Sequence, residues 1–198
     1  MAEANNLTTR QRILDMAGAL FYQQGFRAVG VDTIVREAGV AKMTLYRYFP
    51  SKDGLIVAYL ESANRSSWEW FEAAVAARQG DPRGQVLAVF EALEKLVRTP
   101  ACHGCLFIVA ASEFPEAETP GHRVALAHKL SVRARFREMA RQAGASHPTL
   151  LADRLLLLMD GAFSAVRMFG LDNPGRRVGG AAAAALLDGD LRRSEGVA

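Results

Sequence analysis

The sequence predicts an all-α protein. Apolar residues recur at the three- to four-residue spacing of helices along most of the 198 residues. No stretch alternates apolar and polar residues between hairpin turns, as a half-buried strand would. Proline and glycine flank many of the periodic segments, in positions where they begin and end helices. We therefore expect helices joined by short turns.

The N-terminal part is expected to hold three helices and the start of a long fourth one. Ile13, Ala17 and Phe21 share one helical face, and Gly25 suits the left-handed position that follows a helix. Gly39 separates two shorter helical segments by a tight turn. The expected helices cover about residues 9–24, 32–38, 41–47 and 52–78, the last of which links two domains.

Prolines and glycines also delimit the helices of the remaining chain. Pro82 and Pro148 suit the first turn of a helix, while Gly144 stands beyond one helix and Gly170 closes another. The expected helices cover about residues 82–97, 104–113, 121–143, 148–170 and 178–188.

Length and composition favour a soluble protein with a real core. Half of the residues are apolar, but the longest apolar runs are far shorter than the twenty or so residues that cross a bilayer. The N-terminus lacks the pattern of a secretory signal, so a cytoplasmic location without membrane binding is expected. The net charge of +3 is modest, and charge alone does not indicate a nucleic-acid partner.

The most informative stretch runs from Val31 to Lys52. Its apolar positions can form the interior of three crossing helices: Ile34, Val35, Ala38, Val40, Leu45 and Phe49. Other positions remain available to the outside: Lys42, Met43, Thr44, Tyr46 and Tyr48. A helix that enters the major groove of DNA needs this division, because one face anchors it while the other presents side chains to bases and phosphates.

This stretch resembles the signature of the tetracycline-repressor (TetR) family. The shared features are an apolar second helix, a Gly-Val turn, a Thr-Leu-Tyr core and a Phe-Pro-Ser-Lys exit, and the resemblance covers about residues 9–60. It implies a helix-turn-helix DNA-binding domain over 1–50 and a C-terminal ligand-sensing and dimerisation domain over 51–198. It further implies a dimer that represses transcription at operator DNA and is released by a small effector. The large apolar side chains of the C-terminal part lead us to expect an apolar or amphipathic effector.

The resemblance also assigns roles to individual residues. It places Lys42, Met43 and Thr44 near base edges, and it places Thr33, Tyr46, Tyr48 and Lys52 near phosphates. Lys42 is the strong donor that can select guanine, whereas Met43 offers only apolar contact. Gly30 and Ala41 depart from the family, because a hydroxyl residue usually caps the second and third helices there.

The C-terminal part offers candidates for effector binding and dimerisation. Large apolar side chains are usually core, but they also line ligand cavities, and four are candidates: Trp68, Phe71, Phe107 and Phe163. A basic face is either solvated or meets an acidic ligand: Arg133, Arg135, Arg137 and Arg141. The leucine run 155–158 and the alanines 181–185 predict a two-fold dimer formed by the helices at 148–170 and 178–188.

Besides activation of transcription in place of repression, three alternatives remain open at this point. Cys102 and Cys105 resemble half of a metal site, which His122, His128 and Glu113 would have to complete, and they could also form a redox switch. The third alternative is a helical module that binds another protein instead of DNA. No catalytic motif is evident, so we expect neither an enzyme nor a cofactor.

Overall fold

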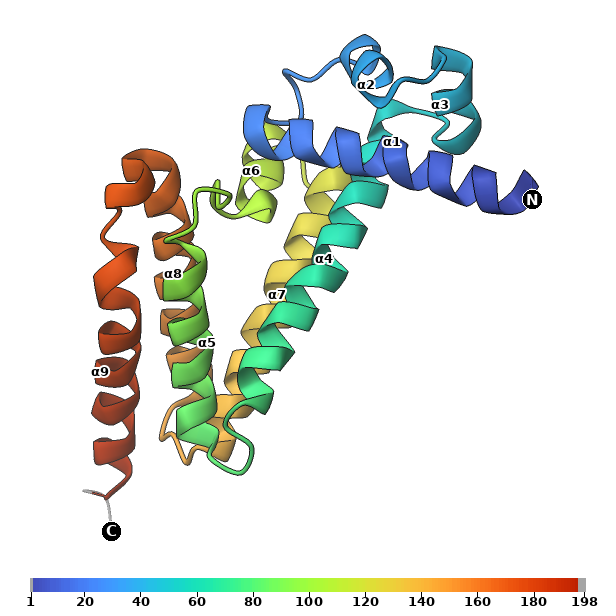
Figure 1. The fold of residues 1–198 in the computed structure, drawn as a ribbon. Helices are drawn as coiled ribbons and strands as arrows, with labels where there is room; N and C mark the ends of the chain where they lie inside the picture. Colours follow the sequence, from blue (N-terminus) through green and yellow to red (C-terminus); the bar gives the residue numbers. More distant parts are fainter. Residues whose placement is uncertain (1, 196–198) are drawn as a thin grey trace. The chain divides into compact units, whose positions relative to one another are not determined.

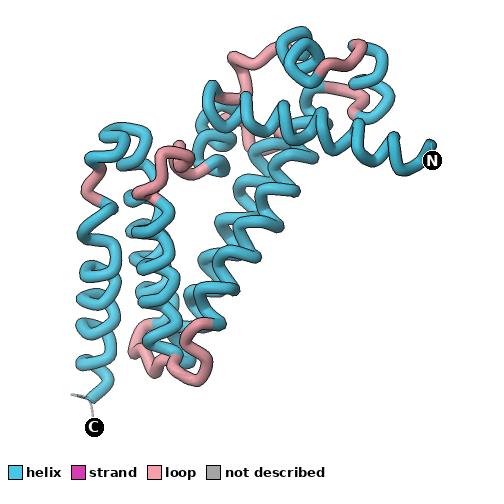
Figure 2. The backbone as a smooth tube through the Cα atoms, in the orientation of Figure 1, coloured by secondary structure: helices cyan, strands magenta, loops and turns pink. Residues whose placement is uncertain are grey.

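The computed structural model describes residues 2–195, without the side chains of residues 2–8, 178 and 192–195. Every regular element in this range is a helix (Figure 1), and loops or turns join the helices (Figure 2). The elements are α1 (Ala2–Gln24), α2 (Val31–Ala38), α3 (Lys42–Tyr48), α4 (Lys52–Ala76), α5 (Pro82–Leu96), α6 (Leu106–Glu113), α7 (Pro120–Gln142), α8 (Pro148–Phe169), η1 (Gly170–Asp172) and α9 (Gly175–Glu195). The predicted all-α class is confirmed.

Two helices are longer than the sequence pattern indicates. α1 begins at Ala2 and not near residue 9, in keeping with the helix-forming residues Ala2–Ala4. α9 begins directly after Pro174 and continues beyond residue 188. The adjacent Gly179 and Gly180 obscure this start in the sequence. They have no apolar side chain to continue the periodicity, and glycine is a poor helix former. Contacts with neighbouring helices, described below, hold α9 instead.

The chain divides into two compact units. The first comprises residues up to Arg65 together with Leu106–Ala127, and the second comprises Ser66–Cys105 together with His128–Ala198. Both α4 and α7 contribute residues to each unit. The predicted division at residue 50 concerns function, and it stays a prediction.

In the first unit, α1 packs against α2 and α3 through an aromatic and aliphatic core. The rings of Phe21 and Phe26 are fully buried, with centroids 5.3 Å apart. The ring of Tyr59, from α4, lies so close to α1 that a Cβ atom on Gly18 would be 2.4 Å from it. Glycine is therefore required here, and burial raises the pKa of Tyr59 to about 12.

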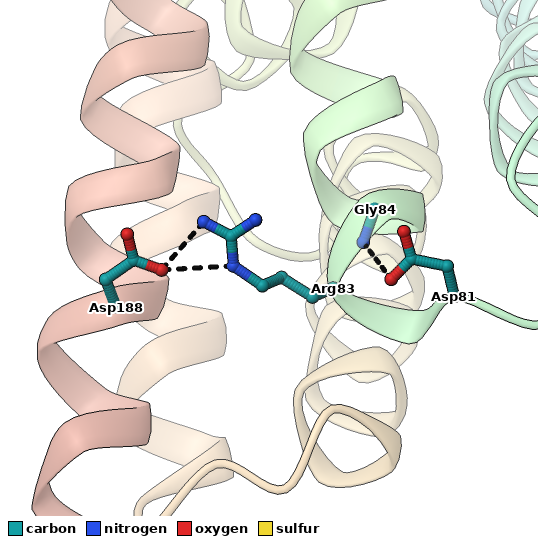
Figure 3. A network of polar contacts seen from close by, with 4 residues as sticks. All are labelled: Asp81, Arg83, Gly84 and Asp188. Carbon is teal, nitrogen blue, oxygen red and sulfur yellow. Dashed lines mark hydrogen bonds and ion pairs between the residues drawn. The ribbon is translucent and has the colours of Figure 1, made fainter.

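In the second unit, α9 packs along both α5 and α8 (Figure 1). Figure 3 shows one polar link of this packing: the guanidinium of Arg83 on α5 donates to Asp188 on α9, with distances of 3.0 and 2.7 Å. Beside it, the Asp81 carboxylate caps α5 by accepting the Gly84 N–H at 2.9 Å.

Two carboxylates fix the remaining length of α9. Glu94 on α5 accepts the backbone N–H of Gly180 at 2.8 Å. The buried Asp190 accepts the N–H of His147, the residue that precedes α8, at 3.0 Å. The Asp190 carboxylate on α9 thus stabilises the positively polarised N-terminus of α8. Within the described residues, no helix is long and apolar enough to span a membrane.

Candidate nucleic-acid interface

A glycine turn fixes the crossing of α2 and α3. Gly39 has a φ of 62° and a ψ of 42°, the left-handed conformation that favours glycine. Its N–H donates to the Arg36 carbonyl, and the next N–H, of Val40, donates to the Val35 carbonyl at 3.0 Å. These bonds satisfy carbonyls at the end of α2. The turn predicted from the sequence is therefore present.

One face of the two helices is anchored in the first unit. Ile34 and Ala38 on α2, together with Leu45 on α3 and the following Phe49, are buried. These residues are among those that the sequence places in the interior. Burial of this face leaves the opposite side of α3 free to project from the unit.

The exposed side of α3 carries a cation beside an apolar side chain. Met43 is 79% exposed, and Tyr46 is also exposed. The ammonium of Lys42 lies 2.8 Å from the Asp32 carboxylate of α2. This hydrogen bond and the negative charge of Asp32 raise the pKa of Lys42 above its ordinary value, so the side chain is a stable cation.

The other predicted DNA contacts lie at the margins of this face. Thr33, Thr44 and Tyr48 are half-buried. Lys52, at the start of α4, donates to the Arg27 carbonyl at 3.4 Å. The roles assigned to all seven residues stay predictions.

Two arginines that the sequence analysis did not select lie on α3 or beside the residue that follows it. The guanidinium of Arg47 lies 5.1 Å from the ring centroid of Tyr48 and donates to the Tyr48 hydroxyl at 3.4 Å. Arg10, on α1, lies 4.9 Å from the ring centroid of Phe49. Stacking on a ring holds a guanidinium in place without neutralising its charge. The adjacency of Arg47 and Tyr48 was visible in the sequence, whereas the approach of Arg10 was not.

The two unusual helix starts are as the sequence suggests. Gly30 precedes α2 and Ala41 precedes α3, each in an extended conformation and without a side-chain hydrogen bond. Neither residue has a side-chain oxygen for an unpaired N–H of the first turn. Both helices therefore start without a side-chain cap.

The effector candidates divide between the two units. In the second unit, Trp68 and Phe71 are in contact, with ring centroids 5.4 Å apart, and Phe163 packs against the same core. Phe71 is only 2% exposed, so its ring is part of that core. Phe107 is 3% exposed and belongs to the first unit.

A buried histidine adjoins Trp68, and sequence reasoning considered it only as a metal ligand. His128 lies edge-on to the Trp68 ring, with centroids 6.4 Å apart. Burial, and secondarily the charge of Lys129, lowers the pKa of His128 to about 4. The imidazole is therefore neutral at physiological pH.

The cysteine pair has no metal-binding partners in the described part of the chain. Cys102 and Cys105 are buried thiols. His122 faces the Phe114 carbonyl through Nδ1 at 2.7 Å, and Glu113 binds backbone N–H groups. No group of three or more potential ligands converges among the described residues. A redox role for the pair stays a prediction.

The basic face of α7 is largely neutralised by carboxylates. Arg135 pairs with Glu72 through bonds of 2.8 and 3.0 Å. Arg133 pairs with Asp153, and Arg141 pairs with Glu138 at 2.7 Å. Nothing in this arrangement favours the acidic ligand that the sequence left open.

Comparison with known proteins agrees with this geometry. A family profile described as "Bacterial regulatory proteins, tetR family" matches residues 13–59. A TetR-family transcriptional regulator from Streptomyces coelicolor is 34% identical, with a TM-score of 0.83, over 93% of this chain and 89% of its own. A putative TetR transcriptional regulator from Streptomyces avermitilis is also 34% identical, with a TM-score of 0.80, over 92% of this chain and 97% of its own.

A more distant relative is named as a repressor. The transcriptional repressor NemR of Escherichia coli K12 is 27% identical over 106 residues, which make up 53% of each chain. The similarity to the two Streptomyces structures, by contrast, extends over nearly the whole chain.

Proposed function

Because this chain belongs to the TetR family of bacterial transcriptional regulators, we propose that it is a ligand-responsive repressor. In this proposal a cytoplasmic homodimer occupies operator DNA, and a small apolar or amphipathic effector releases it. The observation that carries the proposal is the exposed side of α3, which presents Lys42 and Met43 away from an anchored, buried face. Family membership argues against the alternative of a module that binds only proteins.

Lys42 is the proposed determinant of base selectivity. It is the first residue of α3, and N-terminal residues of a recognition helix reach base edges in the major groove. An ammonium can donate to the O6 and N7 atoms of guanine, whereas Met43 beside it can contact a thymine methyl group. Thr44, half-buried on the same helix, completes the proposed base-reading set.

The phosphate contacts are assigned to residues around that helix. Hydroxyl groups and cations fix a protein on the DNA backbone without reading sequence. The proposed set is Thr33, Tyr46, Tyr48 and Lys52. Lys52 keeps donor capacity for a phosphate, because an ammonium has three N–H donors and Arg27 accepts only one of them.

The proposed dimer uses the outer faces of α8 and α9. Leu157 is 71% exposed on α8, and Met168 is exposed three turns further along. The exposed positions Ala181 and Ala185 of α9 are small enough for close helix approach. An exposed apolar face of this kind is typical of a surface that a second copy covers.

The proposed effector site lies in the helical core of the second unit, around Trp68, Phe71 and Phe163. Phe107, in the first unit, stays a separate candidate. Aromatic residues with one buried imidazole, His128, suit a mostly apolar guest with few hydrogen-bonding groups. Because the Phe71 ring is already buried, a ligand would have to displace core side chains to enter. Such a ligand releases DNA only if it binds the DNA-free arrangement better.

The function is tested with a duplex selected by the protein from a random pool. We expect Lys42→Ala to lose most of the discrimination between the selected duplex and a scrambled one, because a base contact is removed. Lys52→Ala should weaken both duplexes similarly and reduce the dependence of affinity on salt. Equal binding of the selected duplex by the parent and both variants would contradict the assignment.

Dimerisation is tested by sedimentation velocity. Leu157→Glu should give monomers at micromolar concentration, because it places a charge in the proposed interface. Leu130→Glu is the matched control, since Leu130 is also an exposed leucine, on α7 and outside that interface. A parent protein that is already monomeric would refute the dimer.

Effector response is tested by fluorescence of Trp68 and Trp70. Candidate apolar and amphipathic compounds are titrated with and without saturating selected duplex. A true effector must bind more weakly in the presence of DNA, by the same factor by which it weakens DNA binding. If no compound of a broad panel shows this coupling, the sensing role loses its support.

A further inference from the structure

Glu113, the last residue of α6, binds the backbone of the loop between α1 and α2. Its Oε1 atom accepts the Phe26 N–H at 3.1 Å, and its Oε2 atom accepts the Arg27 N–H at 2.6 Å. Hydrogen bonds to a carboxylate are stronger than those between neutral groups. One side chain therefore fixes two successive peptide groups that lie 87 and 86 residues earlier in the chain.

The surroundings of Glu113 accommodate this arrangement. Gly25 has a φ of +89°, and a Cβ atom there would lie 2.4 Å from Oε1, so any other residue would obstruct the carboxylate. The ring of the next residue, Phe114, lies 5.7 Å from that of Phe26 and 6.0 Å from the Arg27 guanidinium. Two successive residues of one segment thus engage two successive residues of the other.

The loop is also bound from α4. The Lys52 ammonium donates to the Arg27 carbonyl, so the backbone of Arg27 is held at its N–H by α6 and at its carbonyl by α4. Beyond Arg27, the loop passes the buried Val29 and reaches Gly30, the residue directly before α2. The path of this loop therefore sets the start of α2 and the environment of Lys52.

We infer that Glu113 is a positioning residue for DNA binding. By holding the α1–α2 loop it fixes the placement of α2 and of the Lys52 ammonium, and it acts through the loop without contacting DNA itself. This inference rests on the proposed DNA-binding function. The inference predicts that loss of the Glu113 carboxylate weakens DNA binding. Simple electrostatics predicts the opposite, because a carboxylate near a phosphate-binding surface repels DNA and its removal should tighten binding.

The test compares two variants with the same change in charge. Glu113→Gln keeps the size of the side chain, but its amide has only one acceptor atom and its NH₂ group faces an N–H donor. We expect it to bind the duplex selected by the parent at least tenfold more weakly in fluorescence anisotropy. Glu116→Gln, at an exposed position in the loop after α6, is the control and should bind as tightly as the parent or more tightly.

A double-mutant cycle separates positioning from general destabilisation. Lys52→Ala should weaken DNA binding strongly in the parent but much less in Glu113→Gln, because Lys52 is already displaced there. The inference would be overturned if Lys52→Ala weakened DNA binding by the same factor in the parent and in Glu113→Gln. It would also be overturned if Glu113→Gln bound DNA like the Glu116→Gln control. Failure of the parent to bind any duplex would instead overturn the proposed function.

Discussion

Burial of His128 makes the stability of the second unit depend on pH. The folded protein holds the pKa of this imidazole at about 4, against 6.5 in an exposed chain. Between these values the unfolded chain binds the proton and the folded chain does not, so unfolding is favoured as the pH falls. Above about pH 6.5 His128 does not reduce the free energy of unfolding. Below that pH the free energy of unfolding falls progressively, until the pH reaches about 4.

The magnitude follows from the two pKa values. Their full difference corresponds to about 3 kcal/mol, at about 1.4 kcal/mol for each pKa unit. Between pH 7.5 and pH 5.0, a site with these two pKa values loses about 2 kcal/mol of the free energy of unfolding. The neighbour Trp68 provides an optical probe, because its ring contacts the imidazole edge-on.

The assay is urea unfolding at pH 7.5 and pH 5.0, followed by tryptophan fluorescence at constant protein concentration. His128→Gln has no proton to gain, so its loss of free energy between the two pH values should be smaller than the parent's by about 2 kcal/mol. His103→Gln, in the loop before α6, is the matched control for removal of an imidazole. Identical losses in the parent and in His128→Gln would refute the reasoning.

Three further changes should alter the free energy of unfolding, measured by thermal and urea denaturation. Ala41→Ser should raise it by about 1 kcal/mol, because it supplies the missing cap of α3. Asp190→Ala should lower it by about 2 kcal/mol, since the partly buried N–H of His147, directly before α8, loses its acceptor. Gly104→Ala should lower it by about 2 kcal/mol, because φ is +92° and the new Cβ would lie 2.8 Å from the Phe163 carbonyl oxygen. No change in any of the three would contradict its stated cause.

The helix boundaries were largely predictable because they depend on local chemistry. Pro82, Pro120 and Pro148 each stand at the first position of a helix, where a missing N–H costs nothing. Gly39 and Gly170 have positive φ values just beyond helix ends. These signals act over one turn of chain, so a single sequence contains them in full.

Contacts between distant segments were not predictable in the same way. Nothing near Glu113 indicates that its partners are the N–H groups of Phe26 and Arg27, because a backbone donor has no sequence signature. The effector candidates suffer from a different ambiguity, since apolar pockets and apolar cores use the same residue types. The nearly complete burial of Phe71 illustrates it.

The ion pair between Lys42 and Asp32 bears on how the proposed base reader selects its site. Both side chains are largely exposed, and exposed pairs of this kind are weak, so guanine acceptors can compete for the ammonium. Without such acceptors, Lys42 stays with Asp32, whose carboxylate then also disfavours nearby phosphates. The ion pair should therefore weaken the binding of Lys42 to non-specific DNA more than its binding to a site with a matching guanine. If Lys42 reads a base as proposed, selectivity at this position depends on α2, which carries Asp32, as well as on α3, and hence on the loop that Glu113 holds.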